Sequence, residues 1–336
     1  MELKELNRTI NEKKFSNLYF FYGEEDYLKE FYANRIIQSV VDDSFACFNL
    51  FHYQELPDKN ELQNALEQPP MMAEYKVVYL NQTDLMKAPA DFREALTEQM
   101  KNIAPFIILI IRETTPDKRS TIWKTAEQKG VTVECSYPNQ ADMRAFINRE
   151  FQKRQKKIPP SLVDKIINEG EPNMYATVNL IDTVCAYLQD TQTVTEQVLN
   201  QFLQKSMQAV IFDLSEFLVT GQKEKAYQLL NQLKLTPSKT PPQMIFTLLA
   251  RRISGMYLAK VSQEERVPTA EIKPLLGKNV PDFVITKYLR QGKNIPLSKL
   301  EQLIIFCAET DFKLKSGRMP DPYLGIYTLF LQFWSL

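Results

Sequence analysis

The chain has 336 residues, of which 44% are hydrophobic, and its 41 basic and 41 acidic side chains give a formal net charge of zero. This length exceeds a single compact core and predicts two or three domains. Zero net charge argues against a stand-alone nucleic-acid-binding protein, which would usually carry a basic excess. No apolar run approaches the roughly 20 residues of a membrane helix. The charged N-terminus also lacks the apolar core of a signal peptide, so we expect a cytoplasmic protein with no membrane contact.

The first 137 residues alternate strand-sized apolar runs with amphipathic stretches. Predicted strands cover residues 18–22, 45–53, 75–80, 106–111 and 131–135, and predicted helices cover residues 24–41, 60–67, 91–103 and 120–129. Alternation at this spacing predicts a parallel sheet with helices on its faces.

The segment Tyr137-Pro138-Asn139 breaks this alternation, and no convincing strand follows it. Predicted helices cover residues 141–153, 160–168, 174–188, 195–203, 207–221, 226–233, 244–261, 281–291, 297–314 and 322–333, with a loop at Pro237, Pro241 and Pro242. The predicted fold class is therefore α/β plus all-α, with domains at residues 1–139, 140–206 and 207–336.

One apolar stripe in the last region recurs at helical spacing and predicts a core; it consists of Leu297, Leu300, Leu303, Ile304 and Cys307. The stripe leads into Asp311 and Lys315, which are four residues apart and can pair across one helical turn.

Metal and histidine chemistry is not expected. The four cysteines form no CxxC pair and are Cys47, Cys135, Cys185 and Cys307. They have apolar neighbours, which predicts buried packing. His52 is the only histidine, which argues against a zinc site and against a Ser-His-Asp triad. A structural role is favoured for it.

A nucleotide site is not expected either. Gly23 stands where a phosphate-binding loop would begin, but residues 24–29 (Glu-Glu-Asp-Tyr-Leu-Lys) provide no second glycine and no Lys-Ser/Thr pair. The three carboxylates there favour a helix N-terminus through the helix dipole. Asn81 and Gln82 follow a predicted strand where an ATPase would carry acidic residues. We therefore expect no catalytic residue and no cofactor.

Two segments leave alternatives open. In residues 67–74, Pro69 and Pro70 stiffen the chain before Met71 and Met72. The methionines suit a protein-binding knob, but composition alone favours a cap on the sheet edge. The basic run 153–157 can touch phosphates or form a solvated helix end.

Several motifs together resemble the delta subunit of the bacterial DNA polymerase III clamp loader. Residues 22–28 look like that family's opening motif, and residues 70–78 are similar to its Pro-Phe-Phe-x-x-x-Arg-Leu-Val segment. Residues 117–119, 212–226 and 309–317 match its Asp-x-Arg-type turn, the start of its third domain and its Asp-x-x-x-Lys-x-Gly ending. The match departs at Met71-Met72, where the family carries an aromatic or leucine pair. It also departs at residues 179–184, where one asparagine and one acid of the family pattern survive.

The resemblance implies a degenerate AAA+-like sheet domain without a phosphate loop, a small helical lid and a helical collar. It implies a non-catalytic accessory subunit of the polymerase holoenzyme that binds and opens the sliding clamp during DNA replication. Pro70, Met71 and Met72 would bind the clamp. The partners would be the clamp, the motor and delta-prime subunits, and primed DNA within the complex.

Three alternative functions conflict with features of the sequence. A true ATPase of this fold conflicts with residues 24–29. A stand-alone nucleic-acid-binding protein conflicts with the charge. A delta-prime-like or other clamp-loader AAA+ subunit is the nearest alternative, but delta-prime usually carries a zinc-binding cysteine cluster that this sequence does not contain.

Overall fold

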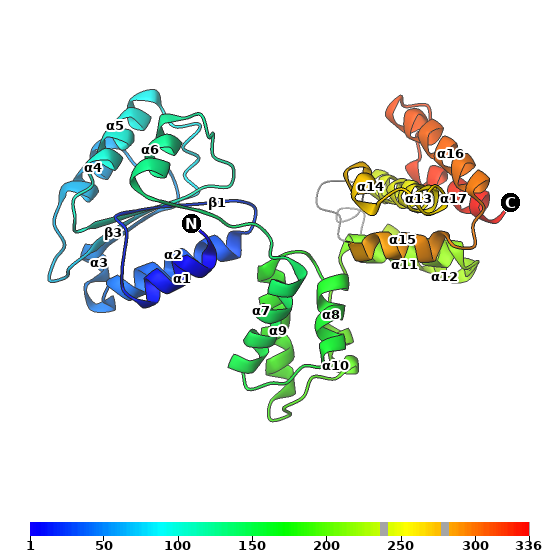
Figure 1. Ribbon diagram of the computed structural model, residues 1–336, viewed down its shortest axis with the longest axis horizontal. Helices are drawn as coiled ribbons and strands as arrows, with labels where there is room; N and C mark the ends of the chain where they lie inside the picture. The colour runs from blue at the N-terminus through cyan, green and yellow to red at the C-terminus, as the bar shows by residue number, and fades with distance from the viewer. Residues whose placement is uncertain (236–240, 277–281, 336) are drawn as a thin grey trace. The chain divides into compact units, whose positions relative to one another are not determined.

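The computed structural model describes residues 1–235, 241–276 and 282–335, and combines one parallel sheet with many helices (Figure 1). The predicted fold class, α/β followed by all-α, is confirmed. Within the described ranges, no helix is long and apolar enough to cross a membrane. The same ranges contain no cluster of three or more His, Cys, Asp or Glu side chains that could hold a metal.

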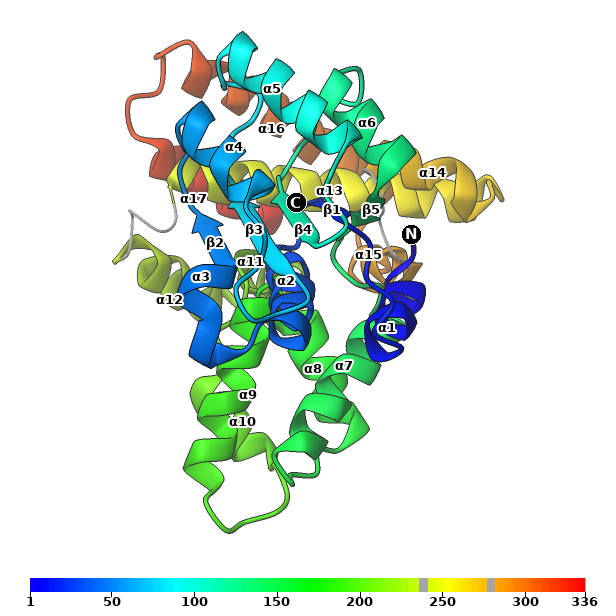
Figure 2. The same cartoon turned by 90° about the vertical axis from the view of Figure 1, so that its left-hand side faces the viewer.

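The sheet has five strands in the order β2-β3-β4-β1-β5, and each neighbouring pair is parallel. The strands are β1 (Leu18–Tyr22), β2 (Leu50–Tyr53), β3 (Lys76–Asn81), β4 (Ile107–Arg112) and β5 (Val131–Glu134). Figure 2 shows them side by side in this order. The three central strands are buried almost throughout. Burial on both faces explains why they read as continuous apolar runs instead of alternating ones.

Helices cover both faces of the sheet (Figures 1 and 2). Helices α1 (Leu3–Asn11) and α2 (Asp26–Val40) lie on one face, and α4 (Lys59–Glu67), α5 (Ala90–Lys101) and α6 (Thr121–Lys129) lie on the other. Successive strand residues serve opposite faces. Phe20 meets Trp123 of α6 edge to face at 5.5 Å, whereas Tyr19 and Phe21 stack with each other.

The prediction for residues 45–53 is wrong in its first half. Asp42 accepts a hydrogen bond from the Ser44 amide and opens a short 3-10 turn (η1, Asp43–Phe45), which leads into helix α3 (Ala46–Asn49). Only residues 50–53 form a strand. Periodicity does not separate a short apolar run into helix and strand. Cys47 lies on α3 and is exposed, so buried packing is wrong for it, whereas Cys135 and Cys307 are buried as predicted.

Besides α3, two helices were not predicted: α1, and α14 (Thr269–Leu276). The remaining helices are close to the predicted ranges. They are α7 (Gln140–Lys153), α8 (Pro160–Glu169), α9 (Met174–Leu188), α10 (Glu196–Phe202), α11 (Met207–Val219), α12 (Lys223–Lys234), α13 (Pro242–Glu264), α15 (Asp282–Gly292), α16 (Leu297–Lys315) and α17 (Pro322–Trp334). Pro237 and residue 281 of the predicted ranges lie outside the described residues.

The chain forms two compact units. One contains Met1–Ile158 and Pro172–Val194, and therefore holds the sheet together with α7 and α9. The other contains Pro159–Glu171 and Thr195–Leu336, and therefore holds α8, α10 and all later helices. The division into three domains, with its two boundaries at residues 139 and 206, remains a prediction.

The predicted core stripe on α16 is confirmed in the second unit. Leu300, Leu303 and Cys307 are buried among α11, α13 and α17, and Ile304 packs against the same cluster. Leu297, at the start of the helix, is half-buried. Asp311 and Lys315 form the predicted pair, with 2.6 Å between Oδ2 and Nζ, on the exposed side of the helix.

Candidate functional site

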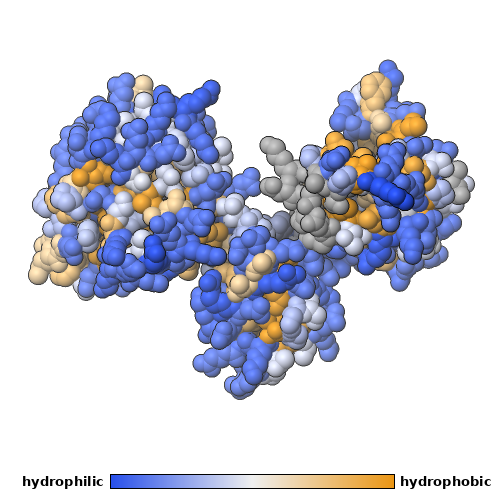
Figure 3. All heavy atoms as spheres, viewed as in Figure 1, coloured by the Kyte–Doolittle hydropathy of each residue, from blue (hydrophilic) through white to orange (hydrophobic). Residues whose placement is uncertain are grey.

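The loop of residues 68–75 joins α4 to β3 and presents two apolar side chains to solvent. Met71 is 48% exposed and Met72 is 80% exposed. A cap on the sheet edge would bury at least one of them, so this alternative does not describe the structure. In Figure 3 a moderately hydrophobic patch lies at the outer edge of the sheet-containing unit, on the side where Figure 1 shows α3. The pair Met71-Met72, called the methionine pair below, is thus accessible.

A side chain from outside this loop forms hydrogen bonds with the loop backbone. Asn49, the last residue of α3, is fully buried. Its Nδ2 donates to the Met71 carbonyl oxygen at 2.8 Å, and its Oδ1 accepts from the Met71 amide at 2.8 Å. One carboxamide therefore satisfies both backbone polar groups of Met71. The side chain of Met71 takes no part in this pairing and stays available.

Both ends of the 68–75 loop are anchored as well. The buried Nζ of Lys76, the first residue of β3, lies 3.4 Å from the Gln68 carbonyl oxygen and 4.4 Å from the Phe51 ring centroid. Burial lowers the pKa of this lysine. The Tyr75 ring meets Phe15 edge to face. The loop is thus tethered on each side of the methionine pair.

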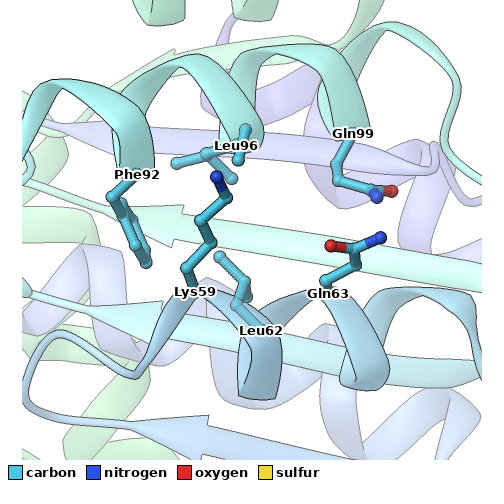
Figure 4. A pocket seen from close by; sticks show the side chains of 7 residues that line it. Lys59, Leu62, Gln63, Phe92, Leu96 and Gln99 are labelled. Carbon is cyan, nitrogen blue, oxygen red and sulfur yellow. The ribbon is translucent and has the colours of Figure 1, made fainter.

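Helix α4, which leads into the loop, is tied to α5. Glu67, its last residue, accepts hydrogen bonds from Gln63 (2.8 Å) and from Gln99 of α5 (3.0 Å). Figure 4 shows Gln63 and Gln99 facing each other across a small hollow between the two helices. The hollow is lined by aliphatic carbons and amides, and we assign it a packing role. These amides keep the end of α4 in place.

Met72 has a left-handed backbone conformation, with φ of 51°. A residue with a bulky side chain adopts this region at a cost of roughly 1–2 kcal/mol. Such conformations persist where the surrounding contacts over-determine them, and they gather at binding sites. The sequence gives no signal of it, because glycine or asparagine would be the ordinary residue at such a position.

The turn between β1 and α2 (residues 23–25) is where the sequence lacks a phosphate loop. Gly23 has φ of +112°, and a Cβ there would lie 2.5 Å from the Cys135 carbonyl oxygen, so only glycine fits. The ammonium of Lys29 is fully buried. It donates to the carbonyl oxygens of Gly23 (2.6 Å) and Glu113 (3.2 Å) and lies 2.9 Å from the Asp26 carboxylate. The only lysine of the motif points at one backbone oxygen of the turn and at another directly after β4.

A second cation extends this network. Arg112, at the end of β4, is 3.1 Å from the Asp26 carboxylate and 3.5 Å from that of Glu30, and it donates to Asn81 at 3.1 Å. Burial raises the pKa of Asp26, but hydrogen bonds from Lys29 and Arg112 outweigh it and leave the pKa lowered. The negative charge of Asp26 is therefore compensated within the chain.

The same turn joins the sheet to α9. Glu25 is buried, accepts from the Tyr27 amide (3.1 Å) and from the Met174 amide (3.4 Å), and so serves the first turns of both α2 and α9. This confirms the expected role of an acid at a helix N-terminus. Burial raises the pKa of Glu25. One turn further along α2, Glu30 accepts a hydrogen bond from the hydroxyl of Tyr175, the second residue of α9.

The other candidate residues have structural partners. His52, on the outer strand β2, stacks on Tyr79 with ring centroids 4.7 Å apart and lies 3.2 Å from Asn81. In the basic run, Lys153 and Arg154 both pair with Glu150, at 2.7 Å and 2.9 Å. This fits a paired helix end better than a free phosphate-binding patch.

The fold is a parallel α/β sheet followed by helical bundles, and two family models match the sequence of this chain. One, described as the DNA polymerase III delta subunit, matches residues 19–136, and the other, its C-terminal domain, matches residues 208–333. The chain belongs to the DNA polymerase III delta subunit family. The resemblance seen in the sequence is thereby confirmed.

Bacillus subtilis provides a similar sequence and a similar solved structure. The DNA polymerase III subunit delta of strain 168 is 21% identical over 325 residues, covering 94% of this chain and 92% of that protein. A solved structure of the Bacillus subtilis DNA clamp loader delta protein has a TM-score of 0.58 at 20% identity, and the match covers 99% of both chains. This second likeness establishes a shared fold over nearly the whole length.

Proposed function

We propose that this chain is the clamp-opening subunit of a bacterial clamp loader, and that the 68–75 loop is its contact with the sliding clamp. Family membership supports the clamp-loader role. The observation that carries the clamp contact is the exposure of Met71 and Met72 on a loop whose backbone is held by a buried side chain.

The physical basis of this contact is an apolar wedge. Methionine is unbranched and polarizable, so it adapts to a pocket of irregular shape. Each methionine seated in such a pocket removes apolar surface worth about 1.5–3 kcal/mol from water. Because the loop is already held at Gln68, Met71 and Tyr75, little backbone freedom remains to be lost on docking. The seated pair would hold one side of the clamp interface open while the ring passes around primed DNA.

The experiment is the double variant M71A/M72A. Its affinity for the purified sliding clamp should fall about a hundredfold or more, since every 1.4 kcal/mol is a factor of ten. Its melting temperature should hardly change, because exposed side chains contribute little to the core. M86A is the matched control, since Met86 is 46% exposed on another loop of the same unit, and it should bind normally. Full affinity of a normally folded M71A/M72A would mean that the contact lies elsewhere.

The proposed subunit is non-catalytic, and the motors of the complex bind and hydrolyse ATP. The basis is the β1–α2 turn, where Lys29 is directed to the carbonyl oxygens of Gly23 and Glu113. Three acidic residues, Glu24 to Asp26, would also repel a triphosphate. The isolated chain should show no heat of ATP binding in calorimetry. A dissociation constant in the micromolar range would contradict this part of the proposal.

The proposed contacts with the other subunits and with DNA rest on membership of the delta subunit family. Helices α11, α12, α13, α16 and α17 share one core, and we assign the region from residue 207 onward the collar contacts with the motor and delta-prime subunits. Primed DNA would be met within the assembled complex, because zero net charge gives the chain alone no general attraction for it. We place this work in the cytoplasm.

A further inference from the structure

We propose that Asn49 is the positioning residue of the clamp contact: its buried carboxamide sets the backbone of the methionine pair before the clamp arrives. This inference rests on the proposed function of the 68–75 loop. It adds a residue that lies 22 positions before Met71 in the sequence and would not itself touch the clamp.

The hydrogen bonding of Asn49 is directed at the loop and not at its own helix. The end of α3 is closed by the Leu50 amide, which donates to the Ala46 carbonyl oxygen. The carboxamide is therefore not needed as a cap. Instead it pairs with the amide and the carbonyl of Met71, each at 2.8 Å. A side-chain amide is one of the few neutral groups that can donate and accept at once in this way.

This pairing fixes the peptide groups on both sides of Met71. The carbonyl that Asn49 holds belongs to the peptide group leading into Met72, whose φ is 51°. An unsupported loop would leave this sparsely populated conformation. We infer that Asn49 keeps Met72 left-handed, and that this conformation keeps the Met72 side chain turned out to solvent.

The anchors at the ends of the loop are separate from this one. Lys76 holds Gln68, and Phe15 contacts Tyr75. Removing the Asn49 carboxamide should therefore loosen the tip of the loop and leave its ends attached. A residue with a merely structural role would change the melting temperature alone, whereas a positioning residue changes the tip and the clamp affinity together.

The first test compares N49A with the control N64A, since Asn64 is exposed on neighbouring α4. N49A should bind the purified clamp about tenfold more weakly, and hydrogen exchange at the Met71 amide should accelerate while β3 amides stay protected. N64A should change neither quantity. A folded N49A with unchanged affinity or an unchanged Met71 exchange rate would overturn the inference.

N49D serves as the second variant. It keeps the oxygen that accepts from the Met71 amide, but replaces the donor to the Met71 carbonyl oxygen by a carboxylate oxygen, which repels that carbonyl. Clamp affinity should fall at least as far as in N49A, and wild-type affinity in folded N49D would contradict the need for the donor.

A double-mutant cycle separates this inference from the proposed function. In the M71A/M72A background nothing is left to position, so adding N49A should weaken clamp binding by less than about twofold. If N49A costs the same factor in both backgrounds, Asn49 acts independently of the methionine pair and the inference fails. If M71A/M72A itself binds at full strength, the proposed clamp contact fails instead.

Discussion

The β1–α2 turn and the 68–75 loop belong to the same α/β unit but lie at opposite edges of the sheet. The turn follows β1, at the carboxyl ends of the strands, where ligands of open α/β sheets usually bind. The loop precedes β3, at the amino ends.

The two segments also differ in which residue satisfies their backbone polar groups. In the turn, the Lys29 ammonium is engaged by the carbonyl oxygens of Gly23 and Glu113 and by the Asp26 carboxylate, so it is not directed at a ligand. In the loop, Asn49 from another segment satisfies the backbone, which leaves the methionine side chains available. At the usual ligand edge the lysine is engaged within the chain, whereas the opposite edge exposes two apolar side chains.

The largest effect should come from opening the closed turn with K29M. This change leaves two partly buried carbonyl oxygens without the lysine donor and removes one cation from Asp26. Losing one partner of a buried charged network typically costs about 3–5 kcal/mol of unfolding free energy, which denaturant titration would measure. K124M, at an exposed lysine of α6, is the control.

Clamp affinity should also be measured on the fraction of K29M that remains folded. It should match the wild type, so that K29M changes stability alone and M71A/M72A changes binding alone. A K29M variant as stable as the wild type would mean that the network is not required to close the turn.

A smaller effect of opposite sign is expected for M72G. Glycine adopts the left-handed conformation without steric cost, so the variant should be about 1 kcal/mol more stable. It should nevertheless bind the clamp more weakly, because half of the methionine pair is gone. M86G, at a residue without positive φ, should be destabilised in the same melting experiment. If M72G loses stability, Met72 is supported by contacts that outweigh its backbone strain.

The smallest effect concerns pH and Glu25. Because its pKa is raised in the folded state, the native protein binds more protons than the unfolded chain between the two pKa values. Stability then falls as pH rises through this window.

E25Q does not ionise and keeps one of the two accepting oxygens, so it loses the acceptor for the Tyr27 or the Met174 amide at every pH. Its melting temperature relative to the wild type should rise by on the order of one degree between about pH 4 and about pH 7. E24Q, at an exposed neighbour, should show no such trend. A difference that is constant with pH would show that Glu25 does not titrate in this range.

Sequence patterns predicted the sheet and most helices because their apolar residues recur at clear periods. Where the period was ambiguous, as at residues 45–53, the strand prediction failed for the part that is helical. The exposed pair at Met71 and Met72 was visible as a proline-stiffened segment. The sequence did not reveal whether the two side chains point inward or outward. Their orientation depends on Asn49, and no local sequence pattern connects Asn49 to the methionine pair.

The buried cations were missed for a related reason. Lys29 and Lys76 look like ordinary surface lysines in the sequence. Their burial follows from carbonyl oxygens that folding brings within reach, such as that of Glu113, 84 residues away from Lys29. Sequence periodicity carries no information about such distant acceptors.

The assignment of alternate helices to different units has a consequence for synthesis on the ribosome. The chain crosses between units after Ile158, Glu171 and Val194. The N-terminal unit therefore cannot be completed when its sheet has emerged, because α9, which supplies Met174 and Tyr175, follows later. Residues 159–171 emerge before α9, although the rest of the unit to which they belong begins only at Thr195. Nascent chains arrested before residue 194 should accordingly expose the α2 surface that α9 covers, and they are the intermediates on which chaperones would act.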